Sequence, residues 1–144
     1  MTLLVADVGG TNSRVAMAAN SSAAPTDIQH FENRNFASFY DVLQAYVSSH
    51  SGISISGCCV AMAGPVTNGT GRLTNLDWDI SANLLSATLK CPNTLLLNDL
   101  TALGYSLRLL PSKNLRSVAN PSDRSKRNGQ SSTQKSDIQK TPTQ

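Results

Sequence analysis

Short apolar runs of strand length alternate with segments of helical periodicity over the first 110 residues of this 144-residue chain. The runs that favour strands lie at residues 2–7, 14–19, 28–31, 57–63 and 94–97. Apolar side chains recur at helical spacing over residues 36–47, 81–89 and 99–110. Strands that alternate with helices predict an α/β fold with a mostly parallel sheet, which begins with an antiparallel pair.

The first strand delivers a carboxylate, Asp7, to the turn Gly9-Gly10-Thr11-Asn12. Glycines permit positive φ angles and leave no Cβ in the way, so backbone N–H groups can approach an anion closely. Thr11 and Asn12 add side-chain donors, and Asp7 could hold Mg²⁺ through water, since that ion takes few carboxylates. The turn therefore predicts a site for a metal-bound polyphosphate. The alternative is an ordinary β-hairpin whose glycines only make the turn.

Two established nucleotide-binding motifs are absent from the chain. It contains neither the lysine-bearing G-x-x-x-x-G-K-[ST] loop nor the dinucleotide motif G-x-G-x-x-G. The two histidines suggest no further chemistry: His50 is expected to end a helix in a structural role, and His30 has no neighbour in the sequence that marks it as a ligand or base.

A second acid, Asp99, also follows directly after an apolar strand. Ligands of open α/β sheets gather at the carboxyl ends of strands, which is where Asp7 and Asp99 are both expected. Asp99 opens a helix whose dipole favours the ionised carboxylate, and that carboxylate could accept a proton from a substrate hydroxyl while Asn98 orients the substrate. The alternative for Asn98-Asp99 is a plain helix cap, because both residue types are favoured there.

A weaker candidate site surrounds the tryptophan of the chain. Asn75, Asp77 and Asp79 flank Trp78, and amides and carboxylates beside an aromatic ring could line a sugar site. The alternative is that Trp78 packs the domain while the acids are solvated. We favour this alternative for Asp77 and Asp79 and keep Asn75 as a substrate-binding candidate.

Charge and composition separate residues 1–111, the expected lobe, from residues 112–144. Up to residue 110 the chain has five Lys/Arg and seven Asp/Glu, a balance of −2, whereas the remainder has seven and two, a balance of +5. Residues 112–144 are rich in Ser, Gln, Asn and Thr and hold too few apolar side chains for a core, which predicts a disordered tail. The tail has no aromatic residue to stack on a base, so no nucleic-acid partner is expected.

The cysteines and the N-terminal segment indicate the compartment. Cys58, Cys59 and Cys91 lack C-x-x-C spacing, so neither a zinc site nor a disulfide framework is expected, and reduced thiols fit best. There is no basic segment followed by an apolar run, as in a signal peptide, and no apolar stretch of membrane-spanning length. The expected location is therefore cytoplasmic, without a membrane partner.

Three stretches in matching order, LVADVGGTNSRVAM, VAMAGPVTNGTGRLTNLDW and LLLNDLTALGYSL, resemble the bacterial ATP-dependent glucokinase family. The resemblance covers residues 2 to about 118. It implies the N-terminal lobe of the actin-like ATPase (ribonuclease H-like) fold, a mixed sheet with helices. It also implies ATP and Mg²⁺ as cofactors and transfer of the γ-phosphoryl group to the 6-hydroxyl of glucose. The residues implied are Asp99 as catalytic base, Asn98 as glucose ligand, and Asp7, Gly9, Gly10, Thr11 and Asn12 as the phosphate motif.

The chain departs from that family after residue 118. Glucokinases of this type continue into a second lobe with further glucose-binding acids, a histidine and a glycine-rich adenosine motif, and nothing here resembles them. We therefore expect a truncated kinase, with a face that is exposed where the second lobe would dock and that favours self-association. Two alternatives are an inactive fragment that at most binds sugar or phosphate weakly, and a sugar-responsive repressor, which would need a helix-turn-helix segment that is not visible.

Overall fold

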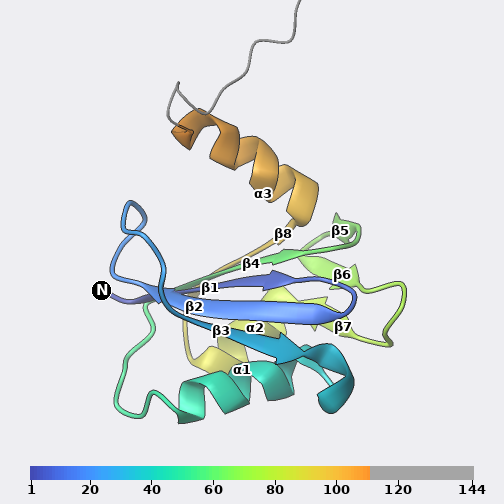
Figure 1. The fold of residues 1–144 in the computed structure, drawn as a ribbon, viewed down its shortest axis with the longest axis horizontal. Helices are drawn as coiled ribbons and strands as arrows, with labels where there is room; N and C mark the ends of the chain where they lie inside the picture. Colours follow the sequence, from blue (N-terminus) through green and yellow to red (C-terminus); the bar gives the residue numbers. More distant parts are fainter. Residues whose placement is uncertain (111–144) are drawn as a thin grey trace, which may run out of the picture. The chain divides into compact units, whose positions relative to one another are not determined.

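The computed structural model describes residues 1–110, which are organised around a five-stranded sheet of order β3-β2-β1-β4-β8 (Figure 1). Its strands are β1 Leu3–Val8, β2 Asn12–Ala18, β3 Thr26–Glu32, β4 Gly57–Met62 and β8 Asn93–Asn98. The β1–β2 and β2–β3 pairs are antiparallel, whereas β4 is parallel to both β1 and β8. This mixed sheet with its antiparallel start confirms the α/β class predicted from the sequence.

A small three-stranded sheet is formed by the segment between β4 and helix α2 (Ala82–Leu89). Its strands are β5 Val66–Thr67, β6 Thr70–Arg72 and β7 Asp79–Ser81. Between β5 and β6, Asn68 and Gly69 have φ angles of 52° and 70°, the positive values of a two-residue hairpin turn. The sequence pattern did not predict these strands, because strands of two or three residues are too short to show alternation.

The helices are α1 Phe39–Ser48, α2 Ala82–Leu89 and α3 Asp99–Ser106, with 3₁₀ turns at Asn33–Asn35 and Leu107–Leu109. The start of α1 differs from the prediction, which placed Phe36 in the helix. Phe36 has extended backbone, and Ser38 is the N-cap, since its side chain accepts a hydrogen bond from the backbone N–H of Asp41. Ser81 caps α2, which begins where the helical spacing predicts, and its Oγ lies 3.1 Å from the backbone nitrogen of Leu84.

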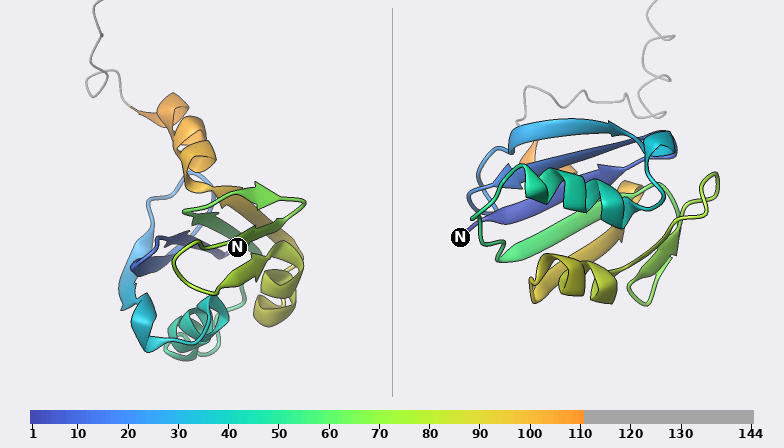
Figure 2. Two further views of the ribbon diagram at one scale, coloured as in Figure 1. Left: turned by 90° about the vertical axis from the view of Figure 1, so that its right-hand side faces the viewer. Right: turned by 90° about the horizontal axis from the view of Figure 1, so that it is seen from below.

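Helices α1 and α2 cover the same face of the large sheet (Figure 2). The core lies between them and the sheet, and its fully buried side chains include Leu4, Val8, Val15, Val60, Met62, Phe39, Leu43, Tyr46 and Leu85. Along β1, residues 4, 6 and 8 are buried while the alternate residues are half-buried. The central strand β1 is therefore covered fully on one face only.

Helix α3 continues from β8 and extends away from the large sheet (Figure 1). None of its residues is buried. Large apolar side chains are exposed along α3 and the turn that follows it, and on strands β3 and β8: Leu100, Leu103, Tyr105, Leu107, Leu109, Ile28 and Leu95. Apolar exposure of this extent is typical of surfaces that contact another protein or lobe.

Two further expectations concern sequence-wide properties. Within the described 110 residues, no helix is both long enough and apolar enough to cross a membrane. The predicted tail of residues 112–144 falls outside the described part.

Cys58, Cys59 and Cys91 are free thiols. Burial raises the pKa of Cys58 to about 12, so this thiol stays protonated and unreactive at neutral pH.

The far end of α1 is tied to β3 through His50. Its Nδ1 lies 2.7 Å from the backbone carbonyl oxygen of Tyr46, and its Nε2 pairs with the carboxylate of Asp27. The Tyr46 carbonyl and the Asp27 carboxylate both favour imidazolium and raise the pKa of His50. The structural role predicted for His50 fits this position, which joins two elements.

The His50–Asp27 pair predicts a pH-dependent contribution to stability. Because the folded-state pKa of His50 lies above its unfolded value, the contribution is complete below the unfolded pKa, about 6.5, and is lost as pH rises through the folded pKa. We expect the difference in unfolding free energy between the wild type and His50→Gln to shrink from pH 6 to pH 8.5. Urea unfolding of both proteins measures this, and a difference independent of pH would contradict it.

Candidate functional site

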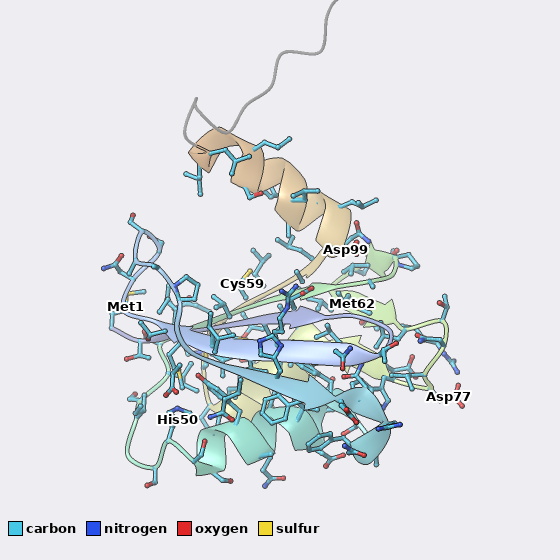
Figure 3. The ribbon with its side chains drawn as sticks, in the orientation of Figure 1. Met1, His50, Cys59, Met62, Asp77 and Asp99 are labelled. Carbon is cyan, nitrogen blue, oxygen red and sulfur yellow. The ribbon has the colours of Figure 1, made fainter. Side chains whose placement is uncertain are left out.

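The two predicted acids lie at one edge of the large sheet. Parallel pairing aligns Val8, Met62 and Asn98 at the carboxyl ends of β1, β4 and β8. Strands β1 and β8 are two interstrand spacings apart. Asp7 therefore lies about 10 Å from the end of β8 that leads into Asp99. Figure 3 labels Asp99 where β8 joins α3, at the same end of the sheet as the β1–β2 turn, while His50 is at the opposite end. The geometry thus brings the turn and Asn98-Asp99 to a shared edge.

The turn between β1 and β2 depends on glycine for space. The backbone N–H of Gly9 donates to the carbonyl of Asn12 at 2.9 Å, and a Cβ on Gly9 would lie 3.1 Å from that oxygen. A Cβ on Gly10 would lie 2.5 Å from Nδ2 of Asn75. Neither glycine adopts a positive φ angle, although glycine permits one. What the turn requires is the absence of Cβ, which leaves the backbone open to close approach.

A polar cavity of about 420 Å³ opens at this turn. It is lined by Asp7, Gly9, Thr11, Asn12, Arg14 and His30. The predicted phosphate residues other than Gly10 are thus collected in one hollow, together with two side chains that can carry positive charge. Sequence reasoning missed His30, which is brought beside Arg14 by the register of β2 and β3. Only the strand pairing, not the spacing in the chain, could have found it.

The carboxylate of Asp7 is paired with Arg14, whose Nε donates to it at 3.1 Å. Both side chains are substantially exposed, at 44% for Asp7 and 59% for Arg14, so water screens the pair and little free energy holds it. The free-energy cost of separating the pair is therefore modest, so that Arg14 can turn to bind an anion and Asp7 can turn to bind a cation. Among the described residues, no group of three or more His, Cys, Asp or Glu side chains could hold a metal. A magnesium ion here would depend on Asp7, water and phosphate oxygens.

Asn98 and Asp99 join β8 to α3. The Oδ1 of Asn98 accepts from the backbone N–H groups of Leu100 and Thr101 at 3.0 and 3.4 Å, so Asn98 caps α3. Its Nδ2 donates to the carbonyl of Gly64 at 2.7 Å, which leaves one amide N–H for a substrate. Asp99 is half-buried, and its Oδ1 accepts from Leu100 at 2.7 Å. The second carboxylate oxygen of Asp99 is then the one that can accept a proton.

Asn75 lies between β6 and β7 and contacts the β1–β2 turn directly. Its Nδ2 donates to the carbonyl of Gly10 at 2.8 Å, across 65 residues of sequence. The sequence proposed Asn75 for a sugar, whereas the contact observed is with the turn. Its Oδ1 and second N–H remain able to bind a substrate at the same edge.

The other residues of the tryptophan segment behave as the favoured alternative predicts. Trp78 is 4% exposed, and its ring lies 6.5 Å from that of Phe39, so it packs the core. Asp77 is 98% exposed and pairs only with Arg72, at 2.8 Å, among the described residues. A sugar site on Asp77 and Trp78 is therefore not supported by their positions.

Comparison with known proteins identifies close counterparts of this lobe. A family profile described as Glucokinase matches residues 4–130. A glucokinase of Yersinia pestis (strain Pestoides F) is 30% identical over 112 residues, which cover 78% of this chain and 34% of that protein. The chain thus spans about a third of the length of the curated relatives it matches.

Solved structures agree with the profile. The crystal structure of a glucokinase from an Antarctic psychrotroph superposes with a TM-score of 0.71 at 27% identity, covering 83% of this chain and 40% of that one. A glucokinase from Balamuthia mandrillaris in complex with glucose has a TM-score of 0.59 at 24% identity, covering 74% and 32%, and at that identity supports the fold alone. The predicted fold, an actin-like N-terminal lobe, is confirmed. From the matched profile and the shared fold, this chain belongs to the glucokinase family.

Proposed function

We propose that this chain transfers the γ-phosphoryl group of ATP to the 6-hydroxyl of D-glucose, using the edge of the sheet where β1, β4 and β8 end. The observation that carries the proposal is the shared edge: the glycine turn with its polar cavity lies two strands from Asn98-Asp99. A phosphate cradle and a carboxylate at this spacing could serve the two ends of one transfer. Either feature alone would fit a hairpin or a helix cap.

The residues of the turn fit a magnesium-bound polyphosphate. Gly9 and Gly10 leave room that a Cβ would fill, Thr11 and Asn12 supply donors, and Asp7 supplies a carboxylate for the metal. When bound, magnesium nucleotide supplies the phosphoryl group to be transferred. The chain's own contribution is to orient that group and to offset its charge, which is most of what a loose phosphoryl-transfer transition state requires.

At the other end of the site, Asp99 acts as the base. Its unbonded carboxylate oxygen accepts the proton of the sugar hydroxyl as the oxygen attacks. Asn98 keeps the start of α3 in place through Gly64 and offers its second N–H to a sugar oxygen. Asn75 offers its Oδ1 to the sugar while its Nδ2 holds the turn.

A second candidate function is binding without turnover. The chain spans about a third of the length of its curated relatives, and α3 has no buried residue. A lobe with this open surface could bind phosphate or sugar weakly and associate with itself through the apolar side chains of α3, without closing on both substrates. Sedimentation of the protein over a range of concentrations tests the association. A cytoplasmic location, which we also propose, is compatible with either function.

The test uses the full chain with D-glucose and magnesium ATP. Transfer of radiolabel from the γ-phosphoryl group to glucose reports catalysis, and titration calorimetry with magnesium pyrophosphate reports binding at the turn. The matched variant is Gly10→Val, whose side chain would enter the position now held by Asn75 and should lower pyrophosphate affinity. Binding without label transfer would favour the second function, and neither binding nor transfer in the wild type would refute both.

A further inference from the structure

Two polar side chains of the described lobe are buried behind the phosphate turn. Ser13, in β2, is 0% exposed, and Asn33, in the 3₁₀ turn after β3, is 1% exposed. Ser13 Oγ donates to Oδ1 of Asn33 at 2.7 Å. Burying a hydroxyl and an amide is costly unless both are hydrogen-bonded, and this bond satisfies the two side chains in part. The remaining hydrogen bonds of Asn33 indicate what the buried pair does.

The two N–H donor groups of Asn33 both reach the turn. Its Nδ2 donates to the carbonyl of Gly9 at 2.8 Å, and its backbone N–H donates to the carbonyl of Thr11 at 2.9 Å. One residue therefore holds two carbonyl groups of the turn, and Ser13 fixes the rotation of the amide that makes one of these bonds. The pair supports the turn from the side of β3.

The orientation of these carbonyls decides where the N–H groups of the turn point. In a planar trans peptide the C=O and N–H of one unit point in opposite directions. Because Gly9 and Thr11 direct their carbonyls at Asn33, the N–H groups of Gly10 and Asn12 point away from it. In a closed two-residue hairpin the N–H of Asn12 would donate to the Gly9 carbonyl. Here that carbonyl is directed at Nδ2 of Asn33, and no bond to it from the Asn12 N–H occurs among the described residues.

We propose that Asn33, locked by Ser13, is a positioning residue that keeps the β1–β2 turn open so that its N–H groups can bind phosphate. This rests on the proposed function, in which the turn receives the phosphates of a magnesium nucleotide. Asn33 touches no ligand in this scheme. It acts only through the peptide units of Gly9 and Thr11.

The first experiment measures the turn itself, without any ligand. Asn33→Ala frees the Gly9 carbonyl, so the turn should close, and amide hydrogen exchange of Asn12 should slow by about tenfold, as expected for one new hydrogen bond. The matched control is Asn35→Ala, an exposed asparagine in the same 3₁₀ turn, which should leave that exchange rate unchanged. Equal exchange at Asn12 in Asn33→Ala and the wild type would overturn the proposal.

The second experiment measures affinity, using magnesium pyrophosphate and D-glucose as probes in calorimetry. Asn33→Ala should weaken pyrophosphate binding by about tenfold and leave glucose binding unchanged, whereas general damage to the lobe would weaken both. Ser13→Ala, a smaller change that serves if Asn33→Ala does not fold, should show the same selective loss, and Ser13→Thr, which keeps a hydroxyl, should restore affinity. Unchanged pyrophosphate affinity in both alanine variants overturns the inference while the proposed function stands. A wild type that binds no pyrophosphate refutes the proposed function instead, and the exchange rates then decide the inference.

Discussion

Asp99→Asn should lower glucose-dependent formation of ADP by about 10²–10⁴-fold, the usual contribution of a positioned general base. Asparagine keeps the size of the side chain and an oxygen that can accept from the Leu100 N–H, so α3 should still begin at the same place. What is lost is the carboxylate oxygen that, in the proposed function, accepts the proton of the attacking hydroxyl. The measurement is the initial rate of ADP formation with and without D-glucose.

The matched control for this prediction is Asp77→Asn. Asp77 is 98% exposed on the segment between β6 and β7, and its ion pair with Arg72 is open to solvent, so its loss should leave the rate unchanged. Glucose and pyrophosphate affinities should be equal in the wild type and Asp99→Asn, because the variant changes a proton acceptor and not the phosphate turn. A rate for Asp99→Asn within twofold of the wild type would rule out Asp99 as the base.

The parts of the fold that could be predicted from sequence are those with strong local signals. Residues 3–8 and 93–98 are apolar strands, and Ser81 precedes a run of helical periodicity, so these elements appear where the pattern places them. The start of α1 was missed because the periodic apolar stripe includes Phe36, while the N-cap bond of Ser38 decides where the helix begins. An exposed face was expected, but the strand side chains that lie on it were not identified, since half-buried Val5 and Leu97 look like core residues in a strand pattern.

For the candidate site, sequence identified residues but not their connections. The turn at Gly9-Gly10 and the acid Asp99 stand out because each directly follows an apolar strand. Asn75 and Asn33 reach the turn from residues far away in the chain, through bonds of 2.8 Å that only tertiary packing creates. A single buried serine within an alternating strand was the one available signal for the Ser13–Asn33 pair, and it does not name its partner.

Phe39→Ala should lower the free energy of unfolding by about 3–5 kcal/mol, as for other buried aromatic side chains removed from a core. Phe39 is 0% exposed at the first turn of α1, and its ring lies 6.5 Å from that of Trp78. A domain of this size has a total stability of about 5–15 kcal/mol, so the variant should lose a large part of it. Denaturant unfolding followed by circular dichroism provides the measurement.

The control for Phe39 is another aromatic residue changed to alanine, Tyr105, which is 68% exposed on α3. Tyr105→Ala removes a ring of similar size from the surface and should change stability by less than about 0.5 kcal/mol. Equal losses in the two variants would contradict the core assignment of α1.

The Phe39 substitution should also affect the candidate site, because Trp78 follows Asn75 on the segment that contacts the β1–β2 turn. Loss of the Phe39 ring should therefore loosen the Asn75–Gly10 contact. The affinity of Phe39→Ala for magnesium pyrophosphate should then fall below that of the wild type at denaturant concentrations where the lobe is still folded.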